Sequence, residues 1–414
     1  YLVDIGWKFN GVSQTKKTWS DTLASGDTIH INLGKKFFHP DSAYSLKVWT
    51  SKPNGTADSI TNNDTIQSIN QYPALSGIYT IGGSSPDFNT FADAISAMKR
   101  GGIIDSVRFD VRNGTYFEQL IIPYIVGAKD ENSIIFQSEQ RDSSKVFLVG
   151  ATSSSANYVI RADSLWGATF RHMTFITSKT NYYNHVFEIL NGSGNIKIHD
   201  CNLIGKTTST GAEEAIIYCY NSNSNKPSPR NIEVYNNKFM NGAFGFYDGY
   251  GYSNQGNSRD YNIHHNIFED QYYMGLYLYY VNNFKVNYNQ IYHKNPMYSS
   301  SFGIYAQYNN EGFEIVGNNI YDQEYYGIYL YSSTGSAGDT SLIANNFIQC
   351  KASTGMYGAI IYYPNYLNIV NNNFHVLSSN SGATSCFLYQ PSSTFAYNNN
   401  YTNTGSGYAF YIQG

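Results

Sequence analysis

The chain has 414 residues, a formal net charge of −4 and 14% charged residues, while tyrosine alone fills 40 positions. Ordinary soluble domains carry roughly 25% charged residues, so tyrosine and small polar residues replace much of the usual charged surface. The lack of a basic run argues against nucleic acid as a partner. No apolar stretch approaches the ~20 residues of a membrane-spanning helix, which argues against membrane insertion.

Residues 1–75 predict a small antiparallel sheet, because apolar residues alternate there between turn sequences such as Asn10-Gly11 and Pro53-Asn54-Gly55. The alternating residues are Leu2, Trp7, Phe9, Ile29, Ile31, Leu46 and Val48. A complete β-sandwich needs about seven strands, and this segment supplies about four. We therefore expect a chain that opens inside one module and ends, at Phe410–Gly414, inside a repeat of a longer protein.

Residues 87–102 predict an amphipathic helix, with Asp87 as its N-cap and Gly101-Gly102 as its end. Its apolar face consists of Phe88, Phe91, Ala94, Ile95 and Met98. Such a helix would cover the open first coil of a solenoid, whose core and strand edges need a cap.

From about residue 165 a short pattern recurs, namely an apolar residue, two spacers, usually Asn, one spacer and another apolar residue. Two early repeats have Met173 and Cys201 at the Asn position. The Asn column then consists of Asn237, Asn266, Asn289, Asn318, Asn346, Asn372 and Asn399. Because a side-chain amide at a bend can bond the coils above and below it, this column is expected to be a structural ladder.

The repeat predicts a parallel β-helix of about ten to eleven coils over residues 76–414, with successive coils roughly 4.8 Å apart. Helical repeats are excluded because Gly, Asn, Ser, Thr and Tyr fill the units. A second apolar column, usually preceded by Gly, consists of Leu276, Ile304, Ile328, Ala359, Cys386 and Tyr408. Opposite charges are expected to face each other on adjacent coils at Lys197 and Glu233, and at Lys285 and Glu314.

Several stretches resemble known families. Gly77-Ile-Tyr-Thr-Ile-Gly-Gly, the helix sequence and Asn113-Gly-Thr-Tyr-Phe-Glu118 resemble the start of the right-handed parallel β-helix superfamily, which includes pectate lyases and polygalacturonases. The sequence of this stretch most resembles β-helix proteins exported by Bacteroidota. Ser25-Gly-Asp-Thr-Ile-His-Ile and Tyr44-Ser-Leu-Lys-Val-Trp-Thr resemble CARDB-type immunoglobulin-like adhesion modules.

These resemblances imply an all-β chain in which a partial immunoglobulin-like β-sandwich (1–75) precedes a capped right-handed parallel β-helix (76–414). They also imply a secreted or cell-surface location. The acidic motifs of pectate lyases and polygalacturonases have no counterpart here, which leaves catalysis unsupported by the resemblance.

One candidate for chemistry is the column Asp270, His293 and Asp322, which the register places on three successive coils near 5 Å apart. A His between two carboxylates would have its charged form stabilised. Such a cluster could perform acid–base work on a glycan or bind Ca²⁺, with no other cofactor expected. The alternative is a self-neutralising charge ladder on a solvated turn.

The second candidate is an outward column of Tyr277, Tyr305 and Tyr329, which Tyr279 and Tyr331 extend by two residues. Aromatic faces can stack on pyranose rings while phenol hydroxyls bond sugar hydroxyls. Two alternatives stay open, namely pairing that only stabilises the sheet, and an interface with neighbouring modules or copies of the chain.

The leading function hypothesis is an extracellular adhesin or binding scaffold for polysaccharide or cell-surface glycan. The alternatives are a carbohydrate-active enzyme (a polysaccharide lyase or glycoside hydrolase) and a structural stalk or filament subunit. The cysteines are expected to be free buried thiols, with a disulfide as the alternative. They are Cys201, Cys219, Cys350 and Cys386.

Overall fold

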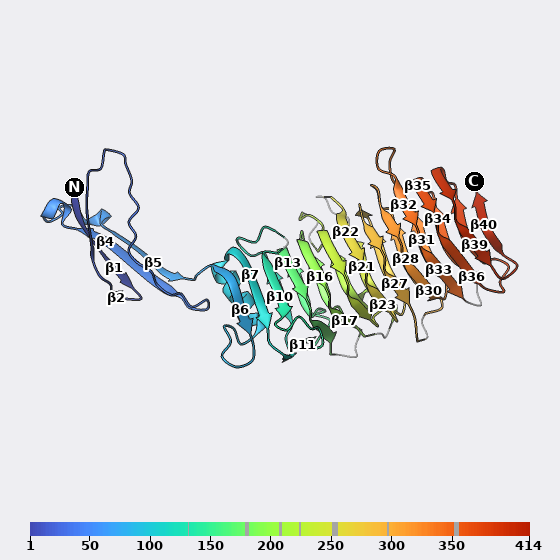
Figure 1. The fold of residues 1–414 in the computed structure, drawn as a ribbon, viewed down its shortest axis with the longest axis horizontal. Helices are drawn as coiled ribbons and strands as arrows, with labels where there is room; N and C mark the ends of the chain where they lie inside the picture. Colours follow the sequence, from blue (N-terminus) through green and yellow to red (C-terminus); the bar gives the residue numbers. More distant parts are fainter. Residues whose placement is uncertain are drawn as a thin grey trace.

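The computed structural model describes residues 1–130, 132–178, 182–206, 209–222, 225–250, 256–295, 298–351 and 356–414. A small sheet at the N-terminus leads into a long stack of parallel coils (Figure 1). The expected all-β class and the parallel β-helix are confirmed. Among the described residues, no helix is both long and apolar enough to cross a bilayer.

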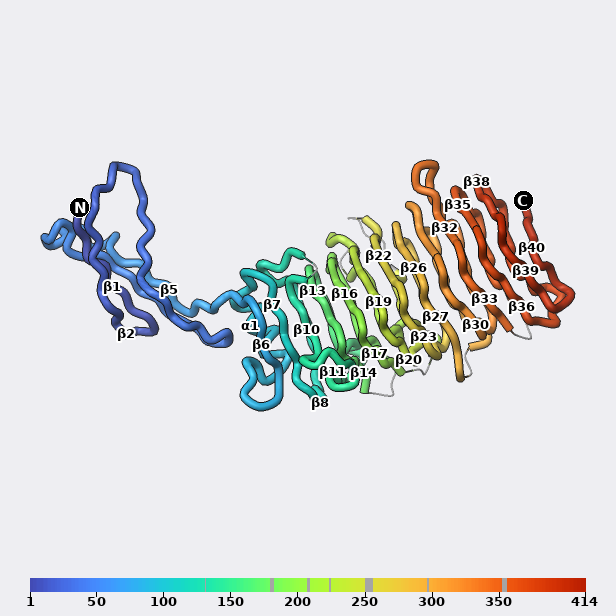
Figure 2. The backbone as a smooth tube through the Cα atoms, in the orientation of Figure 1, coloured from blue at the N-terminus to red at the C-terminus, as the bar shows by residue number. Residues whose placement is uncertain are grey.

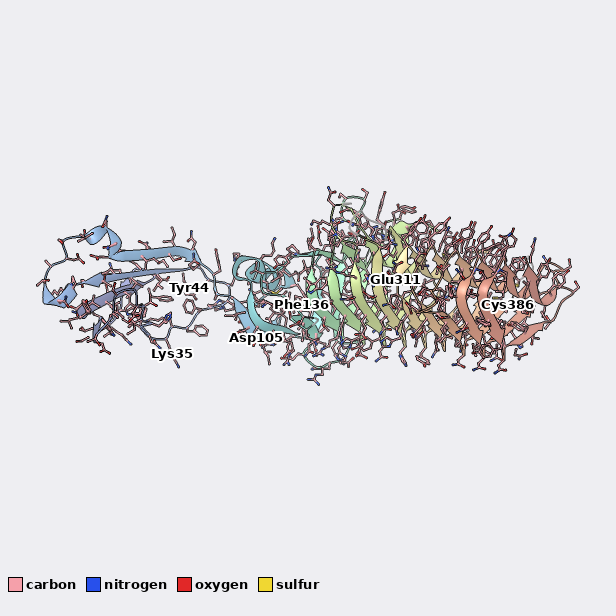
Figure 3. All side chains as sticks on the ribbon, turned by 90° about the horizontal axis from the view of Figure 1, so that it is seen from above. Lys35, Tyr44, Asp105, Phe136, Glu311 and Cys386 are labelled. Carbon is pink, nitrogen blue, oxygen red and sulfur yellow. The ribbon has the colours of Figure 1, made fainter. Side chains whose placement is uncertain are left out.

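The N-terminal strands form one antiparallel sheet in the order β2-β1-β4-β5, with β3 also paired to β1. They are β1 (Leu2–Phe9), β2 (Val12–Ser13), β3 (Lys17–Ser20), β4 (Tyr44–Ser51) and β5 (Thr65–Gln71), with 3₁₀ turns η1 (Pro53–Gly55) and η2 (Thr61–Asn63) between the last two strands. The strand expected around Ile29 and Ile31 is wrong, because residues 28–31 form no strand and Ile29 is 46% exposed. Figure 3 shows this sheet, with Lys35 and Tyr44, beside the start of the coils at Asp105.

Helix α1 (Phe91–Gly101) covers the first coil and begins one residue after Thr90. The Thr90 side chain accepts a hydrogen bond from Asp93 N at 3.0 Å, and Asp93 accepts one from Thr90 N at 3.1 Å. The expected N-cap at Asp87 is wrong, because Thr90 adjoins the helix while Asp87 accepts from Thr80 N and Oγ1. This capping box satisfies two backbone N–H groups that the helix start would otherwise leave unpaired.

The Glu118 carboxylate also holds the start of α1, accepting from Phe91 N at 3.2 Å and Ala92 N at 2.9 Å. A negative charge at this end is favoured by the helix dipole. Phe91 packs against Phe136 and Tyr116, with ring centroids 5.8 and 5.3 Å apart. The helix therefore closes the first coil with its apolar side.

The solenoid has three parallel sheets, here named B, C and D. Figure 2 shows the strands of sheets B and C side by side along the solenoid. Sheet B contains β6 (Leu75–Ile81), β7 (Ile103–Val111), β10 (Ile134–Ser138), β13 (Trp166–Arg171), β16 (Gly194–His199), β19 (Arg230–Tyr235), β22 (Ser258–His264), β25 (Val281–Asn282), β26 (Lys285–Asn287), β29 (Glu314–Val316), β32 (Ser341–Ala344), β35 (Asn365–Val370) and β38 (Ser392–Tyr397). Sheet C contains β8 (Gly114–Tyr116), β11 (Val146–Gly150), β14 (Thr174–Thr177), β17 (Asn202–Ile204), β20 (Lys238–Met240), β23 (Ile267–Glu269), β27 (Gln290–Tyr292), β30 (Asn319–Gln323), β33 (Phe347–Lys351), β36 (Asn373–Leu377) and β39 (Asn400–Asn403). Sheet D contains β9 (Leu120–Pro123), β12 (Ile160–Asp163), β15 (Phe187–Leu190), β18 (Ala215–Tyr220), β21 (Phe244–Tyr250), β24 (Met274–Tyr279), β28 (Phe302–Gln307), β31 (Tyr326–Tyr331), β34 (Tyr357–Tyr362), β37 (Thr384–Tyr389) and β40 (Tyr408–Gln413).

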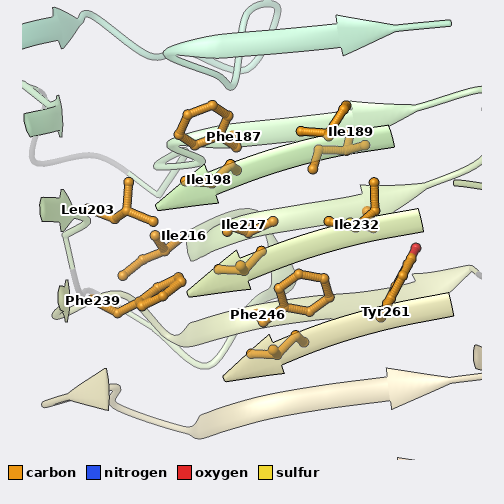
Figure 4. Close-up of a cluster of buried hydrophobic side chains, with 14 of the residues drawn as sticks. Phe187, Ile189, Ile198, Leu203, Ile216, Ile217, Ile232, Phe239, Phe246 and Tyr261 are labelled. Atoms are coloured by element: carbon orange, nitrogen blue, oxygen red, sulfur yellow. The ribbon is translucent and has the colours of Figure 1, made fainter. Parts of the chain in front are cut away.

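The three sheets enclose one apolar core in which equivalent side chains of successive coils lie above one another (Figure 4). Phe239 and Phe268 stack in this way, with centroids 4.4 Å apart. The predicted second apolar column is correct up to Cys386, but its last member is Phe410. Tyr408 instead pairs with Thr384 and is 57% exposed.

The glycine before this column is needed for space. A Cβ on Gly275 would lie 2.6 Å from the carbonyl oxygen of Gly303 and 2.8 Å from the Ile291 side chain. The interior side chains of sheet C therefore press against the backbone of sheet D, and glycine is the residue that fits.

The Asn column forms a buried hydrogen-bonded ladder at the corner between sheets B and C. Asn289 Oδ1 accepts from both Asn266 N and Asn266 Nδ2, each at 3.0 Å. Asn289 Nδ2 donates to Ile263 O at 2.8 Å and to Asn318 Oδ1 at 3.0 Å. The same pattern links each Asn from Asn237 to Asn399 to the next. Backbone amides that the bend would leave unpaired are thereby satisfied.

Outward charges pair between coils as expected, with Lys197 Nζ 3.0 Å from Glu233 Oε2 and Lys285 Nζ 2.8 Å from Glu314 Oε1. Both pairs are partly exposed and contribute little to stability. All four cysteines are buried free thiols.

The ladder gives a stability prediction. Asn289→Ala should lower the free energy of unfolding by about 3 kcal/mol or more, because it removes the buried hydrogen bonds of Asn289 to Asn266 N and Ile263 O. Asn368→Ala, on the outer side of β35, should change it by less than about 0.5 kcal/mol. Denaturant unfolding checks both variants, and equal effects would contradict the role of the ladder.

Candidate functional site

The outer face of sheet D carries a stack of tyrosines at one register position of five successive coils. The tyrosine stack consists of Tyr218, Tyr247, Tyr277, Tyr305 and Tyr329. Its successive ring centroids are 5.2, 4.8, 4.9 and 4.5 Å apart, with interplanar angles of 10°, 10°, 21° and 8°. The sequence pattern predicted the last three members. The triplet Gly245-Phe246-Tyr247, which repeats Gly275-Leu276-Tyr277, would have revealed Tyr247 as well.

The nearly parallel arrangement of the rings determines which of their atoms a ligand can reach. Each ring inside the stack has its faces covered by the rings of the coils above and below. Only its edge and its phenol oxygen lie away from the neighbouring rings of the stack. The expected stacking of sugar rings on the faces of Tyr277 and Tyr305 therefore has no room inside the column, and a sugar would meet a row of hydroxyls.

A second apolar cluster lies beside the stack, outside the main core. Its buried members are Ala215, Ala243, Phe244, Met274 and Phe302. Phe244 meets Tyr247 edge-on at 4.9 Å and 73°, and Phe302 meets Tyr305 at 5.4 Å and 77°. These crosswise contacts fix the orientation of the stacked rings.

Stack and cluster border a depression of about 340 Å³. It is lined by Thr210, Ala212, Phe244, Tyr247, Tyr273, Met274, Tyr277 and Tyr305. Its lining is mostly aromatic, with phenol oxygens and Thr210 as the polar groups. This combination of apolar surface and few polar groups is typical of small-ligand sites.

One border of the depression, the 3₁₀ turn η3 (Ala212–Glu214), is held by a buried polar network. His185 Nε2 lies 2.9 Å from Ala212 O, and Asn157 Nδ2 donates to Glu213 O at 2.9 Å. His185 Nδ1 lies 3.0 Å from Glu188 Oε1, and Arg161 Nε donates to Glu188 Oε2 at 2.5 Å.

The ring of His185 in turn stacks on Tyr218 at 4.3 Å. The network thus joins one border of the depression to the end of the tyrosine stack. Both carboxylate oxygens of Glu188 have hydrogen-bond partners, Arg161 and His185. The three side chains therefore hold this border in place.

The phenols of Tyr305 and Tyr329 stay protonated at neutral pH. Burial raises the pKa of Tyr329 to about 12, with neighbouring tyrosines adding to the effect. Burial also raises the pKa of Tyr305, whose hydroxyl donates to Gln307 Oε1 at 2.8 Å. These groups can therefore donate and accept hydrogen bonds, but they do not act as bases at neutral pH.

The two outer tyrosines do not continue the stack. Gln307 lies between Tyr279 and Tyr331 in the register. Tyr279 meets Tyr280 edge-on at 4.6 Å, and Tyr331 lies 5.8 Å from Tyr362. A binding role for Tyr279 and Tyr331 remains a prediction.

The three residues of the candidate acid–histidine column, Asp270, His293 and Asp322, differ in backbone conformation. Asp270 and Asp322 adopt positive φ values of 63° and 59°. At Asp322 the pairing of β30 with β33 shifts in register between Ile320 and Gln323, as at a β-bulge. Asp270 Oδ1 then accepts from Lys294 N at 2.6 Å, and Asp322 Oδ1 lies 2.5 Å from Lys351 Nζ. Both aspartates are thus already engaged at the surface.

His293 has no such positive φ, and its side chain is 8% exposed. Neither ring nitrogen has a hydrogen-bond partner in the described part of the chain. Burial lowers the pKa of His293 to about 4, and the Asp270 carboxylate does not offset that effect. The expected stabilisation of the charged form is therefore wrong, because desolvation outweighs the attraction of the aspartates.

Within the described ranges, no hydrogen bond or ion pair joins Asp270, His293 and Asp322. The same ranges contain no group of three or more His, Cys, Asp or Glu side chains arranged to hold a metal ion. The catalytic role of the three residues stays a prediction, and no Ca²⁺ ligand set supports it.

No protein-family model and no curated protein sequence matches this chain. Among solved structures, a GH136 lacto-N-biosidase from Eubacterium ramulus is similar, with a TM-score of 0.50, 10% identity and coverage of 81% of this chain and 67% of that one. A DFA-IIIase from Arthrobacter chlorophenolicus has a TM-score of 0.48 at 10% identity, covering 79% and 82%. A Family 28 exopolygalacturonase from Yersinia enterocolitica has a TM-score of 0.33 at 10% identity, covering 99% and 93%. At this identity the likeness shows the β-helix fold alone.

The burial of His293 predicts an acid-sensitive fold. Since its folded pKa of about 4 lies below the ordinary 6.5, the unfolded chain binds more protons between these values. Stability from this group is complete above about pH 6.5 and is lost as the pH falls towards 4, by about 3 kcal/mol in all.

Denaturant unfolding at pH 7 and pH 5 measures this effect. His293→Gln should remove part of this loss of stability at low pH. Glutamine is a suitable replacement because Gln271 and Gln323 are also buried. His375→Gln, on the outer side of sheet C, serves as control. An unchanged pH dependence in His293→Gln would contradict the assignment.

Proposed function

We propose that the protein is an extracellular scaffold that binds polysaccharide along the outer face of sheet D. The observation that carries this proposal is the tyrosine stack beside an apolar depression of about 340 Å³. Ligand pockets commonly have volumes of roughly 300–1,000 Å³, so this depression suits a small part of a larger ligand. One ring of a sugar chain is such a part.

The chemistry of the face fits a sugar better than an apolar ligand. Phe244 and Met274, almost fully buried residues that line the depression, offer apolar surface to the C–H groups of a pyranose. Tyr273 is not part of the stack, and it meets Phe244 and Phe302 edge-on. Its ring therefore replaces the stacked rings as the expected partner for a sugar face.

The repeat of the solenoid supports a polymeric ligand. Phenol hydroxyls recur once per coil, at the ring spacing of about 5 Å. A sugar chain that runs along the solenoid axis would meet a new hydroxyl at each coil, as extended ligands do on other repeat proteins. The low charge of the chain fits a ligand that is recognised by hydroxyls.

The proposal predicts that the hydroxyls of the stack are needed for binding and the rings for folding. The triple variant Tyr277→Phe, Tyr305→Phe and Tyr329→Phe keeps every ring contact. It should stay folded, with a loss of about 0.5–1.5 kcal/mol from the hydrogen bond between Tyr305 and Gln307. Its affinity for a bound polysaccharide should fall by about tenfold or more, at about 0.5–1.5 kcal/mol per lost hydrogen bond. Affinity electrophoresis against a polysaccharide panel measures the loss.

Tyr321→Phe is the matched control, because Tyr321 belongs to a stacked pair with Tyr292 on sheet C, at 4.9 Å and 5°. It should leave binding unchanged. Full binding by the triple variant, or equal loss in the control, would reject sheet D as the site. Self-association that depends on the same tyrosines would favour the interface between copies.

A carbohydrate-active enzyme is the second candidate, supported by the fold likeness to a lacto-N-biosidase and by the two surface carboxylates Asp270 and Asp322. The buried His293 does not support the enzyme, because its lowered pKa makes it a weak base. If the chain is a lyase or hydrolase that uses these residues, Asp270→Asn with Asp322→Asn should abolish the release of new reducing ends. Turnover that survives the double variant would reject this site, and turnover by no wild-type sample, with or without Ca²⁺, would reject the enzyme.

A further inference from the structure

A second concave surface lies at the corner between sheets B and C, away from the outer face of sheet D. This corner groove has a volume of about 390 Å³ and crosses several coils. Its lining includes Arg141, His172, Asp200, Asn236, Lys238 and His265.

The groove follows a row of left-handed turn residues. His172, Asp200, Asn236 and His265 occupy the same corner of four successive coils, with φ of 54°, 54°, 54° and 55°. Arg141, in the preceding turn, also has φ of 54°. This conformation turns their side chains away from the buried ladder, and later coils fill the corner mainly with Asn or Gly. The later residues are Tyr288, Gly317, Asn345, Asn371 and Asn398.

The conformation is uncommon for a residue such as Arg, while Asn and Gly adopt it readily. Arg141 thus stands where the backbone itself favours another residue. A cation and two imidazoles occur at this corner only along the groove, which suggests that they serve the groove and not the turn.

The groove offers more free donors than free acceptors. The Arg141 guanidinium forms no hydrogen bond or ion pair with any described residue, and the same holds for the Asn236 side-chain amide. Lys238 Nζ lies 3.4 Å from Glu269 Oε2, a distance that leaves it able to contact a ligand.

The two carboxylates in the groove are partly used. Asp200 Oδ2 lies 2.7 Å from His199 Nδ1, and Asp142 Oδ1 accepts from Ser144 N at 2.8 Å and from Ser144 Oγ at 2.7 Å. Their remaining oxygens repel an anion, but neither carboxylate pairs with Arg141 or Lys238. The Arg141 guanidinium has no ion-pair partner among the described residues, and Lys238 is paired with Glu269, at 3.4 Å.

We propose that the corner groove binds an oxyanion, either a carboxylate, sulfate or phosphate group on an acidic glycan or the free inorganic ion. A guanidinium presents a planar fork of N–H donors that matches such groups, and the amide of Asn236 adds a neutral donor. Lys238 supplies the second charge. The groove is separate from the tyrosine stack, so this site does not depend on the function proposed for sheet D.

The test uses isothermal titration calorimetry of the whole chain at low salt with three probes. These are an oligoglucuronate, inorganic phosphate and a neutral gluco-oligosaccharide of the same length as the oligoglucuronate. The wild type should bind at least one of the first two and not the neutral chain at this site. Binding should weaken as NaCl is added, because the attraction is between charges.

The variant Arg141→Asn with His265→Asn removes the cation and one imidazole, and Asn already occupies the equivalent corner at Asn236. It should keep or raise the melting temperature and weaken oxyanion binding by tenfold or more. Lys285→Gln removes an exposed cation outside the groove and should leave binding unchanged. If the double variant unfolds, Lys238→Gln removes the other cation from an outward position and makes the same comparison.

The outcomes separate the sources of the oxyanion. Binding of oligoglucuronate without phosphate identifies an acidic glycan, while binding of phosphate alone identifies a site for the free ion. The proposal is overturned if the wild type binds neither probe. It is also overturned if the neutral chain binds equally well with the same dependence on Arg141, or if the groove variants bind as the wild type does.

Discussion

The structure depends on one constraint, that the backbone bend between sheets B and C is buried and must find its hydrogen bonds in the neighbouring coils. The Asn ladder meets this need, since each side-chain amide bonds both the coil before it and the coil after it. An inserted or deleted residue at this bend would break the hydrogen bonds of its Asn to the coil before it and to the coil after it. The spacing between ladder residues can vary only in the loops, and the position of the bend is fixed.

This fixed bend aligns every other position of the coil. Inside, it places aromatic and aliphatic side chains above one another, as for Phe239 and Phe268. Outside, it produces columns whose character depends on the residue chosen. Tyrosines on sheet D form a stack with a protected apolar cluster, while Lys and Glu on sheet B form ion pairs such as Lys285 with Glu314. A functional surface on such a protein consists of equivalent side chains on successive coils. A substitution in one coil therefore alters a surface that extends over several coils.

Features that depend only on the period of the repeat could be predicted from the sequence. The Asn column, the apolar columns and three members of the tyrosine stack all lie at constant offsets within the repeat. Prediction failed where local backbone conformation changes the offset. Asp270, His293 and Asp322 have equal offsets from the ladder, yet positive φ at the two aspartates turns them outward while His293 turns into the core. Composition does not encode that difference.

Other errors have equally local causes. Thr90 caps the helix in place of Asp87 because it adjoins the first turn, and residues 28–31, where a strand was expected around Ile29, form no strand. The corner groove was not foreseen, because it depends on which side chains flank a left-handed turn. The immunoglobulin-like character of the first module, the adhesin role and the extracellular location remain predictions.

The most direct measurement for the central claim is a crystal structure of the chain with an oligosaccharide selected from a glycan array. We expect a sugar chain that lies along the solenoid axis on sheet D, with one ring in the depression beside Phe244 and Tyr273 and its hydroxyls on the phenols of the tyrosine stack. A sugar bound elsewhere with this face empty, or an array on which no glycan binds, would contradict the account.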